Sequence, residues 1–160
     1  MADLTVTITE AVTLNGSSRG STNTLTVAGV DDIYHRIITC PDDVPVTVAN
    51  FHATTGASDS SLDVENVKYI RVTNMDSSNP VIIDLQMDTA EDDSAAADNC
   101  AMLLEAGKSF VMGSPSDGIF VNDGGATPVT ALSSLVNLES IIVDPLSEAV
   151  QVEVFIASVV

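Results

Sequence analysis

The chain has 160 residues, with 23 acidic side chains against five basic ones and a formal net charge of −18. Because no basic run is present to neutralise phosphates or anionic lipids, this balance argues against nucleic-acid and membrane-surface partners. Aromatic residues make up 4% of the chain and tryptophan is absent, which disfavours sites built on stacked rings. The length suits one core, so we expect residues 1–160 to form a single domain.

Strand-type alternation begins at the first residues. Leu4, Val6 and Ile8 alternate with threonines, and the same alternation returns at 22–27 after the turn-forming segment 15–20. A hairpin or connecting loop is therefore expected between these two strands. Further strands are expected at 33–39, 44–51, 67–74, 81–87, 101–104, 109–112, 119–122, 138–143 and 150–158.

The last predicted strand has the clearest pattern, with Val150, Val152, Val154 and Ile156 on one face. Helix is scarce, and only 92–100 and 127–136 are expected to form one or two turns. Roughly ten short strands separated by glycine, proline and aspartate turns predict an all-β fold, a β-sandwich or jelly roll.

Catalytic and cofactor motifs are largely missing. His35 and His52 are the only histidines, and the HxH spacing typical of metal sites on such sheets is absent. We expect His35 to occupy an outward polar position and His52 a strand end. No GxSxG elbow and no glycine-rich phosphate loop occurs, and Gly113-Ser114-Pro115 is typical of an ordinary turn. The sequence predicts a protein that is not an enzyme, with no catalytic, cofactor-binding or metal-binding residues and no cofactor.

Acidic clusters are the remaining candidates for a metal site. Asp88, Glu91, Asp92, Asp93 and Asp98 offer the oxygen ligands that calcium prefers, but they lack the EF-hand spacing and its glycine. A solvated acidic loop is the favoured interpretation, and calcium binding there stays open. We interpret the pair Asp42 and Asp43, and the group Asp59, Asp63 and Glu65, in the same way.

The two cysteines are 60 positions apart and form no CxxC motif. We expect Cys40 and Cys100 to be buried free thiols, with a disulfide as the alternative. Asn15-Gly16-Ser17 matches the glycosylation pattern, but the opening residues lack the features of a secretory signal, and no run of about 18 apolar residues occurs.

Four stretches resemble small virion proteins from tailed bacteriophages of marine bacteria. They are 2–10 (ADLTVTITE), 67–74 (VKYIRVTN), 104–110 (LEAGKSF) and 152–157 (VEVFIA). The resemblance implies a β-sandwich subunit present in many copies on the phage head, where it binds the major capsid protein as a decoration (cement) protein on the outer capsid surface. By analogy with cement proteins at threefold positions, it also implies a homo-oligomer, with a trimer favoured.

Two other functions stay open. One is a tail, fibre or host-adhesion component of the same β-sandwich type, although no long repeat or surface aromatic cluster indicates it. The other is a cupin-like or lectin-like enzyme or sugar binder, because a fold does not fix a function. The polar segments 54–65 and 88–99 are the candidate contact loops, because each is long and lies between predicted strands; exposed loops without a contact role are the favoured interpretation.

Overall fold

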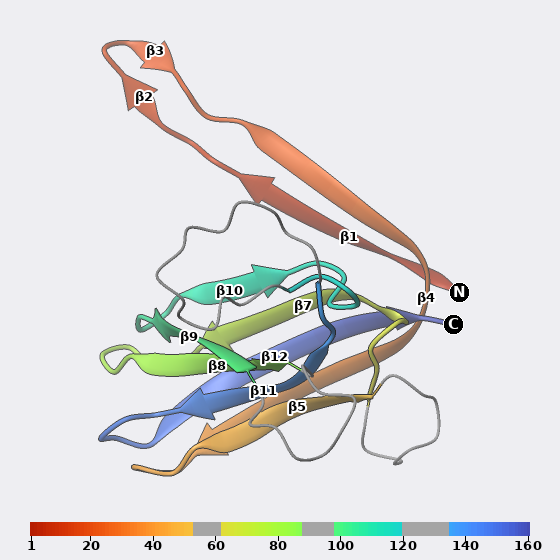
Figure 1. Ribbon diagram of the computed structural model, residues 1–160. Helices are drawn as coiled ribbons and strands as arrows, with labels where there is room; N and C mark the ends of the chain where they lie inside the picture. The colour runs from red at the N-terminus through yellow and green to blue at the C-terminus, as the bar shows by residue number, and fades with distance from the viewer. Residues whose placement is uncertain (53–61, 88–97, 120–134) are drawn as a thin grey trace, which may run out of the picture.

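A computed structural model describes residues 1–52, 62–87, 98–119 and 135–160 (Figure 1). The described residues form strands and connecting turns and contain no helix, which confirms the all-β prediction. The twelve strands are β1 (Ala2–Thr9), β2 (Thr13–Leu14), β3 (Ser17–Ser18), β4 (Thr22–Cys40), β5 (Val46–His52), β6 (Leu62–Asp63), β7 (Val67–Asn74), β8 (Val81–Met87), β9 (Asp98–Leu104), β10 (Ser109–Met112), β11 (Leu138–Asp144) and β12 (Val150–Val159).

Eight of these strands form two antiparallel sheets that pack against each other. One sheet has the order β4-β12-β7-β10, with β1 added at the β4 edge, and the other has β5-β11-β8-β9, with β6 added beside β5. If the eight strands are numbered 1 to 8 along the chain, starting at β4 and leaving out β6, the first sheet has the order 1-8-3-6 and the second has the order 2-7-4-5. Consecutive strands thus cross between the sheets, except for the hairpin of β8 and β9, in the manner of a jelly roll, one of the two architectures expected from the sequence.

Alternating apolar residues of the two sheets meet in one core. Along β12, the side chains of Val150, Val152, Val154 and Ile156 are all buried, as their spacing predicts. Strands β7 and β8 contribute the same period of two, with Ile70, Val72 and Ile83 among their buried members, and Phe51 of β5 fills the space between the sheets. The apolar residues that recur at every second position of the sequence therefore face the core between the two sheets.

Several predicted boundaries agree with the structure to the residue, and others do not. The strands 67–74, 81–87 and 109–112 are found as predicted. The predicted strands 22–27 and 33–39 instead form one strand of 19 residues, β4, because strand pairing continues through Gly29-Val30-Asp31-Asp32 despite a shift of register on each side of Val30. That strand is far longer than the short strands that the sequence predicted.

The predicted helices fall mostly outside the described residues. Where residues of the first, 92–100, are described, the prediction is wrong: Asp98–Cys100 belong to β9, because they pair with Leu85–Met87 of β8. Of the second, 127–136, only the last two residues are described, and Val136 forms a β-bridge with Ile119. Ile119 is also the one described residue of the predicted strand 119–122.

The N-terminal part of β4 and β1 form a hairpin that extends away from the sandwich, seen in red and orange in Figure 1. We call residues 1–28 the arm. Strand β4 pairs with β1 as far as Val30, and from Val30 to Cys40 it pairs with β12. The arm is therefore an extension of a sandwich strand, which changes its partner at one residue.

Candidate functional site

The arm is a regular antiparallel hairpin. β1 pairs with β4 from Leu4 opposite Val27 to Thr9 opposite Thr22, and the chain reverses at the small β2–β3 ladder. The two residues between β2 and β3, Asn15 and Gly16, both have positive φ (53° and 77°). Such a pair is what a two-residue type I′ turn requires, so the glycosylation-like Asn15-Gly16-Ser17 has a structural role as a hairpin turn.

The two faces of the arm differ in chemistry. Residues directly opposite each other in the ladder share a face, so Leu4 with Val27 and Val6 with Leu25 form an apolar face that ends at Ile8. The opposite face consists of six threonines, paired as Thr5 with Thr26, Thr7 with Thr24 and Thr9 with Thr22. The arm therefore has one apolar side and one side of hydroxyl groups.

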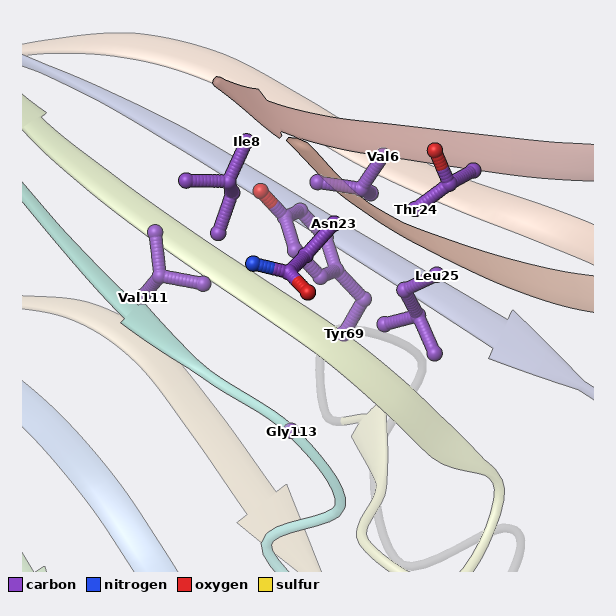
Figure 2. Close-up of a pocket in the computed structure, with 8 residues that line it drawn as sticks. All are labelled: Val6, Ile8, Asn23, Thr24, Leu25, Tyr69, Val111 and Gly113. Carbon is purple, nitrogen blue, oxygen red and sulfur yellow. The ribbon is translucent and has the colours of Figure 1, made fainter. Parts of the chain in front are cut away.

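The apolar face of the arm points toward the outer surface of the β4-β12-β7-β10 sheet. Near its base, Leu4, Val6 and Val27 pack on a small buried cluster of Val30, Tyr69 and Ala157, together with Phe155. Further along, the arm and the sheet diverge and enclose a groove of about 210 Å³ (Figure 2). Its walls are formed by Val6, Ile8, Asn23, Thr24 and Leu25 of the arm and by Tyr69, Val111 and Gly113 of the sheet, none of them charged.

Apolar side chains stay open to solvent on both sides of this groove. On the arm, Ile8, Val12, Leu14 and Leu25 are between 48% and 59% exposed. On the outer sheet face, Ile33, Ile37 and Val111 are between 42% and 57% exposed. Each pairs with an outward-pointing residue of the neighbouring strand, namely Ala157, Glu153 and Arg71 respectively, so the three share the outer face. In the described part of the chain, β1 pairs with β4 alone, so its other edge offers free backbone groups.

Charge is distributed unevenly between the arm and the sandwich. Of the 23 acidic residues, the arm contains two, Asp3 and Glu10, and it also contains Arg19. The formal side-chain charge is thus −1 on the arm and −17 on the remaining 132 residues, from the total of −18. A nearly neutral arm approaches another surface without the repulsion that the acidic sandwich would meet.

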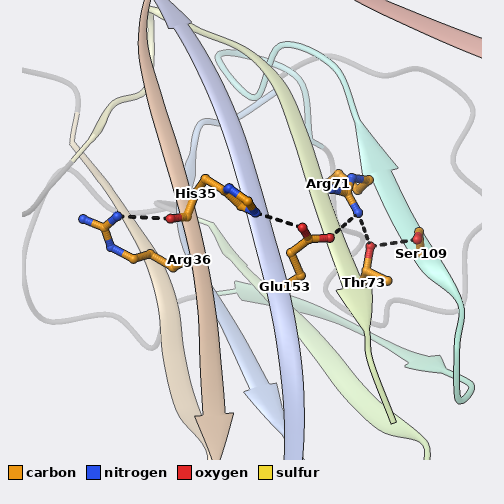
Figure 3. Close-up of polar contacts among 6 residues, drawn as sticks. All are labelled: His35, Arg36, Arg71, Thr73, Ser109 and Glu153. Carbon is orange, nitrogen blue, oxygen red and sulfur yellow. Dashed lines mark hydrogen bonds and ion pairs between the residues drawn. The ribbon is translucent and has the colours of Figure 1, made fainter. Parts of the chain in front are cut away.

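A band of polar contacts crosses the outer sheet face beside the groove (Figure 3). Glu153 of β12 accepts hydrogen bonds from Arg71 Nη1 on β7 (2.7 Å) and contacts His35 Nε2 on β4 (2.8 Å). Arg71 also donates to Thr73 Oγ1, which contacts Ser109 Oγ on β10 at 2.8 Å. The bonds from Arg71 and then His35 hold the pKa of Glu153 below its usual value. These contacts join β4, β12, β7 and β10, and the charges of Glu153 and Arg71 are paired within the band.

Both histidines lie where the sequence places them. His35 is on the outward face of β4 with its side chain 51% exposed, and its partner is Glu153. His52 is the last residue of β5, partly buried, and its carbonyl accepts a hydrogen bond from the Val64 amide (3.0 Å). The structure does not bring the two histidines together in one site, since they belong to different sheets.

The cysteines correct one prediction. Cys40 is buried, which raises the pKa of its thiol, but Cys100 is exposed. Cys100 belongs to β9, the outermost strand of its sheet, where neighbouring strands cover a side chain from one side only. Both thiols are free, as expected.

The acidic candidates are only partly described. Residues 88–97 and Asp59 lie outside the described residues, and Asp98 is in β9. Asp63 is occupied by its own turn, where it accepts hydrogen bonds from the Glu65 amide (3.0 Å) and from Asn66 Nδ2 (3.2 Å). Asp42 and Asp43 form an exposed turn. Within the described ranges, no three His, Cys, Asp or Glu side chains gather as metal ligands would.

The two candidate contact loops also contain strand residues. Leu62–Asp63 at the end of 54–65 form β6, which pairs in parallel with Phe51 and His52, and residues 98–99 belong to β9. Val64 is buried and Glu65 exposed after β6, and the remaining members, 54–61 and 88–97, lie outside the described residues. Among the residues that the structure does describe, no helix is long and apolar enough to cross a membrane.

Comparison of the chain with protein-family models, with curated proteins and with solved structures gave no match.

The arm is the candidate functional feature that the sequence prediction missed. Its two strands and its turn were expected, but not their position outside the sandwich. A signal is present in the sequence: Thr5, Thr7 and Thr9 on one strand match Thr22, Thr24 and Thr26 on the other, which gives a hairpin with a fully polar outer face and few charges. The outer face of a strand within a strongly acidic sandwich would be expected to carry more of the charge.

Proposed function

We propose that this chain is a non-enzymatic structural protein of a virus particle, a decoration protein that binds the outer surface of a tailed-phage head in many copies and stabilises the shell. One observation carries the proposal: the chain holds a nearly neutral, partly apolar hairpin away from a strongly acidic jelly roll. An arm of this kind serves assembly, because its apolar face and free strand edge need a partner surface.

Three further features support this assignment. The jelly roll is a common fold of viral capsid proteins, although lectins and cupins share it. The stretches at 2–10, 67–74, 104–110 and 152–157 resemble small virion proteins of tailed phages, and they correspond to β1, β7, the β9–β10 turn and β12. The acidic sandwich keeps a densely displayed protein soluble. Contact with the major capsid protein would then use strand edges and loops, with many weak contacts adding up through multivalency.

The test is to locate the chain on the particle that carries it. Heads and tails are separated after disruption of purified particles, the chain is quantified in each fraction, and a cryo-electron-microscopy map of the head is inspected for a jelly roll over the junctions between capsomers. Many copies per head are expected. Recovery of the chain with tails and none with heads would replace this proposal by the tail or host-adhesion function.

A binding measurement adds a second test. Heads stripped of the chain are incubated with purified protein, either unmodified or carrying Lys68→Glu and Lys108→Glu as a surface-charge control outside the arm. The unmodified protein is expected to saturate at a fixed number of copies per head and to raise the temperature at which the heads release their DNA. Stripped heads that bind no protein at any concentration would refute head decoration.

A further inference from the structure

We propose that the arm is exchanged between copies: the arm of one chain lies across the outer face of the β4-β12-β7-β10 sheet of a second chain. Leu4 and Val6 of one copy then contact Tyr69 and Phe155 of the other. This inference rests on the proposed function, because it takes the arm to be an assembly surface. The partner of that surface is a second copy of this chain.

The first argument is complementarity that the single chain already displays. The base of the arm packs on Tyr69, Ala157 and Phe155 through Leu4 and Val6. Every copy presents the same outer sheet face, so an arm that fits its own sheet also fits the sheet of a neighbour. Exchange of an identical element in this way is a low-cost route to oligomers.

The second argument is that the arm cannot cover its own sheet fully. The arm continues β4, so its direction is set at the point where β4 changes partner from β1 to β12 at Val30. Beyond its base the arm diverges from the sheet, which leaves Ile8 and Leu25 of the arm and Val111 of the sheet about half exposed across the groove. An arm that arrives from a second copy is free of this constraint and can lie flat over Val111, Ile33 and Ile37.

The third argument concerns the joint. Gly29 precedes Val30 and has a φ of +72°, a conformation that glycine adopts readily and other residues rarely do. One side-chain hydrogen bond spans the joint, from the Gly29 amide to Asp3 Oδ1 at 3.3 Å. A change in the backbone angles here redirects the whole arm, and β1 alone spans about 26 Å at ~3.3 Å per residue, enough to cross the four strands of a neighbour's sheet at ~4.8 Å spacing.

The fourth argument is electrostatic and selects this surface among those of the chain. Two sandwiches with a formal side-chain charge of −17 each repel one another, whereas the arm carries −1 and the groove walls carry no charge. On the outer face, Arg71 and Glu153 already pair with each other. Contact through the arm lets the acidic sandwiches stay apart, where salt screens their repulsion over about 8 Å.

Disulfide trapping distinguishes exchange from closure within one chain. All variants carry Cys100→Ser, which removes the exposed thiol, and Cys40 stays buried. One protein carries Ile8→Cys and a second carries Val111→Cys, from opposite walls of the groove (Figure 2). The two proteins are unfolded, mixed, refolded and oxidised. Exchange predicts a disulfide-linked heterodimer, in which mass spectrometry identifies the peptide that contains Ile8→Cys joined to the peptide that contains Val111→Cys.

Thr9→Cys is the matched control for Ile8→Cys, because Thr9 is the next residue of β1 and lies on the threonine face. Its mixture with the Val111→Cys protein is expected to give only background heterodimer. A single chain that carries both Ile8→Cys and Val111→Cys supplies the opposing outcome: if it closes into a monomeric disulfide and the mixed proteins give no more heterodimer than the control, the exchange proposal is wrong.

Sedimentation velocity tests the same proposal without engineered thiols. The unmodified protein is expected to sediment as an oligomer, and Ile8→Thr with Leu25→Thr, which extends the threonine chemistry to the apolar face, is expected to shift it to monomer with unchanged circular dichroism. An unmodified protein that stays monomeric over the whole concentration series would overturn the proposal. Head binding by a monomer would still support decoration, so failures of the two proposals are distinguishable.

Discussion

Asn74 at the end of β7 is the buried polar residue on which we base the most detailed prediction. Its side chain is fully buried. Its Nδ2 donates to the carbonyl oxygens of Asn79 (2.8 Å) and Leu104 (3.3 Å), and its Oδ1 accepts from the amide of Asp76 (3.0 Å). One side chain thus joins the end of β7, the turn before β8 and the end of β9.

Asn74→Ala removes all three hydrogen bonds and leaves their partners without replacements. The Leu104 carbonyl belongs to a buried residue, and an unsatisfied buried group costs about 1–3 kcal/mol; the two other partners are partly accessible to water and cost ~0.5–1 kcal/mol each. The expected loss in the free energy of unfolding is therefore about 3 kcal/mol. Asn74→Asp is expected to cost at least as much, because a carboxylate oxygen would face two carbonyl oxygens.

Urea denaturation followed by circular dichroism measures this loss. With a slope of about 2 kcal/mol per molar urea, 3 kcal/mol lowers the midpoint by ~1.5 M at unchanged slope. Protein concentration is held fixed, since association shifts apparent stability. Asn99→Ala is the control, because Asn99 is exposed and, among the described residues, its side chain makes one long hydrogen bond, to Asp84 Oδ2 at 3.4 Å. If Asn74→Ala moves the midpoint no further than Asn99→Ala does, our account of the Asn74 contacts is refuted.

Three further predictions concern charge, packing and thiol reactivity. Glu153→Gln is expected to lower the free energy of unfolding at neutral pH. Because the pKa of Glu153 is depressed in the folded protein, the carboxylate stabilises the fold above about pH 4.3, and this stabilisation is lost as the pH falls through the folded pKa. The free energies of unfolding of the two proteins, measured with urea, should therefore converge in acid. A constant difference down to the acid end would contradict this sign. Leu138→Ala in the core (1% exposed) is expected to cost about 2–5 kcal/mol, whereas Leu103→Ala (56% exposed) should stay within ~0.5 kcal/mol; equal thermal or urea midpoints for the two would argue against the core described here. A colorimetric thiol reagent is expected to modify Cys100 in the native protein and Cys40 only after unfolding, and rapid native labelling of both would show that Cys40 is accessible.

Period-two alternation made the sandwich strands predictable. β8 and β12 bury every second residue over seven positions, and β7 does so from Ile70 onward, so a shift of one residue would expose the core face. The 19-residue length of β4 was not predictable in the same way. Its middle, Gly29-Val30-Asp31-Asp32, contains glycine and aspartates, which are uncommon inside strands, and the strand continues through it because β1 and β12 pair with it in succession.

The candidate site depends on contacts between distant segments, which a single sequence does not define. The contact between Arg71 and Glu153 joins residues 82 positions apart, and it exists because β12 lies between β4 and β7. The direction of the arm could not be predicted from the sequence either, because the alternation of Leu4, Val6 and Ile8 fits a strand inside a sheet as well as one that projects from it. The exposure of Cys100 likewise follows from the position of β9 at a sheet edge.

The position of β12 has a consequence for the order in which the protein can fold during synthesis. This strand lies between β4 and β7 and pairs with both over most of its length, so the edge of each neighbour that faces β12 has no partner until residues 150–159 have left the ribosome. The partnering residues Cys40 and Val150 are separated by more than a hundred positions, and such long-range pairing makes folding slow. We therefore expect the nascent chain to expose one unpaired edge each of β4 and β7 until β12 emerges, a state in which neighbouring nascent chains on one messenger RNA are prone to associate.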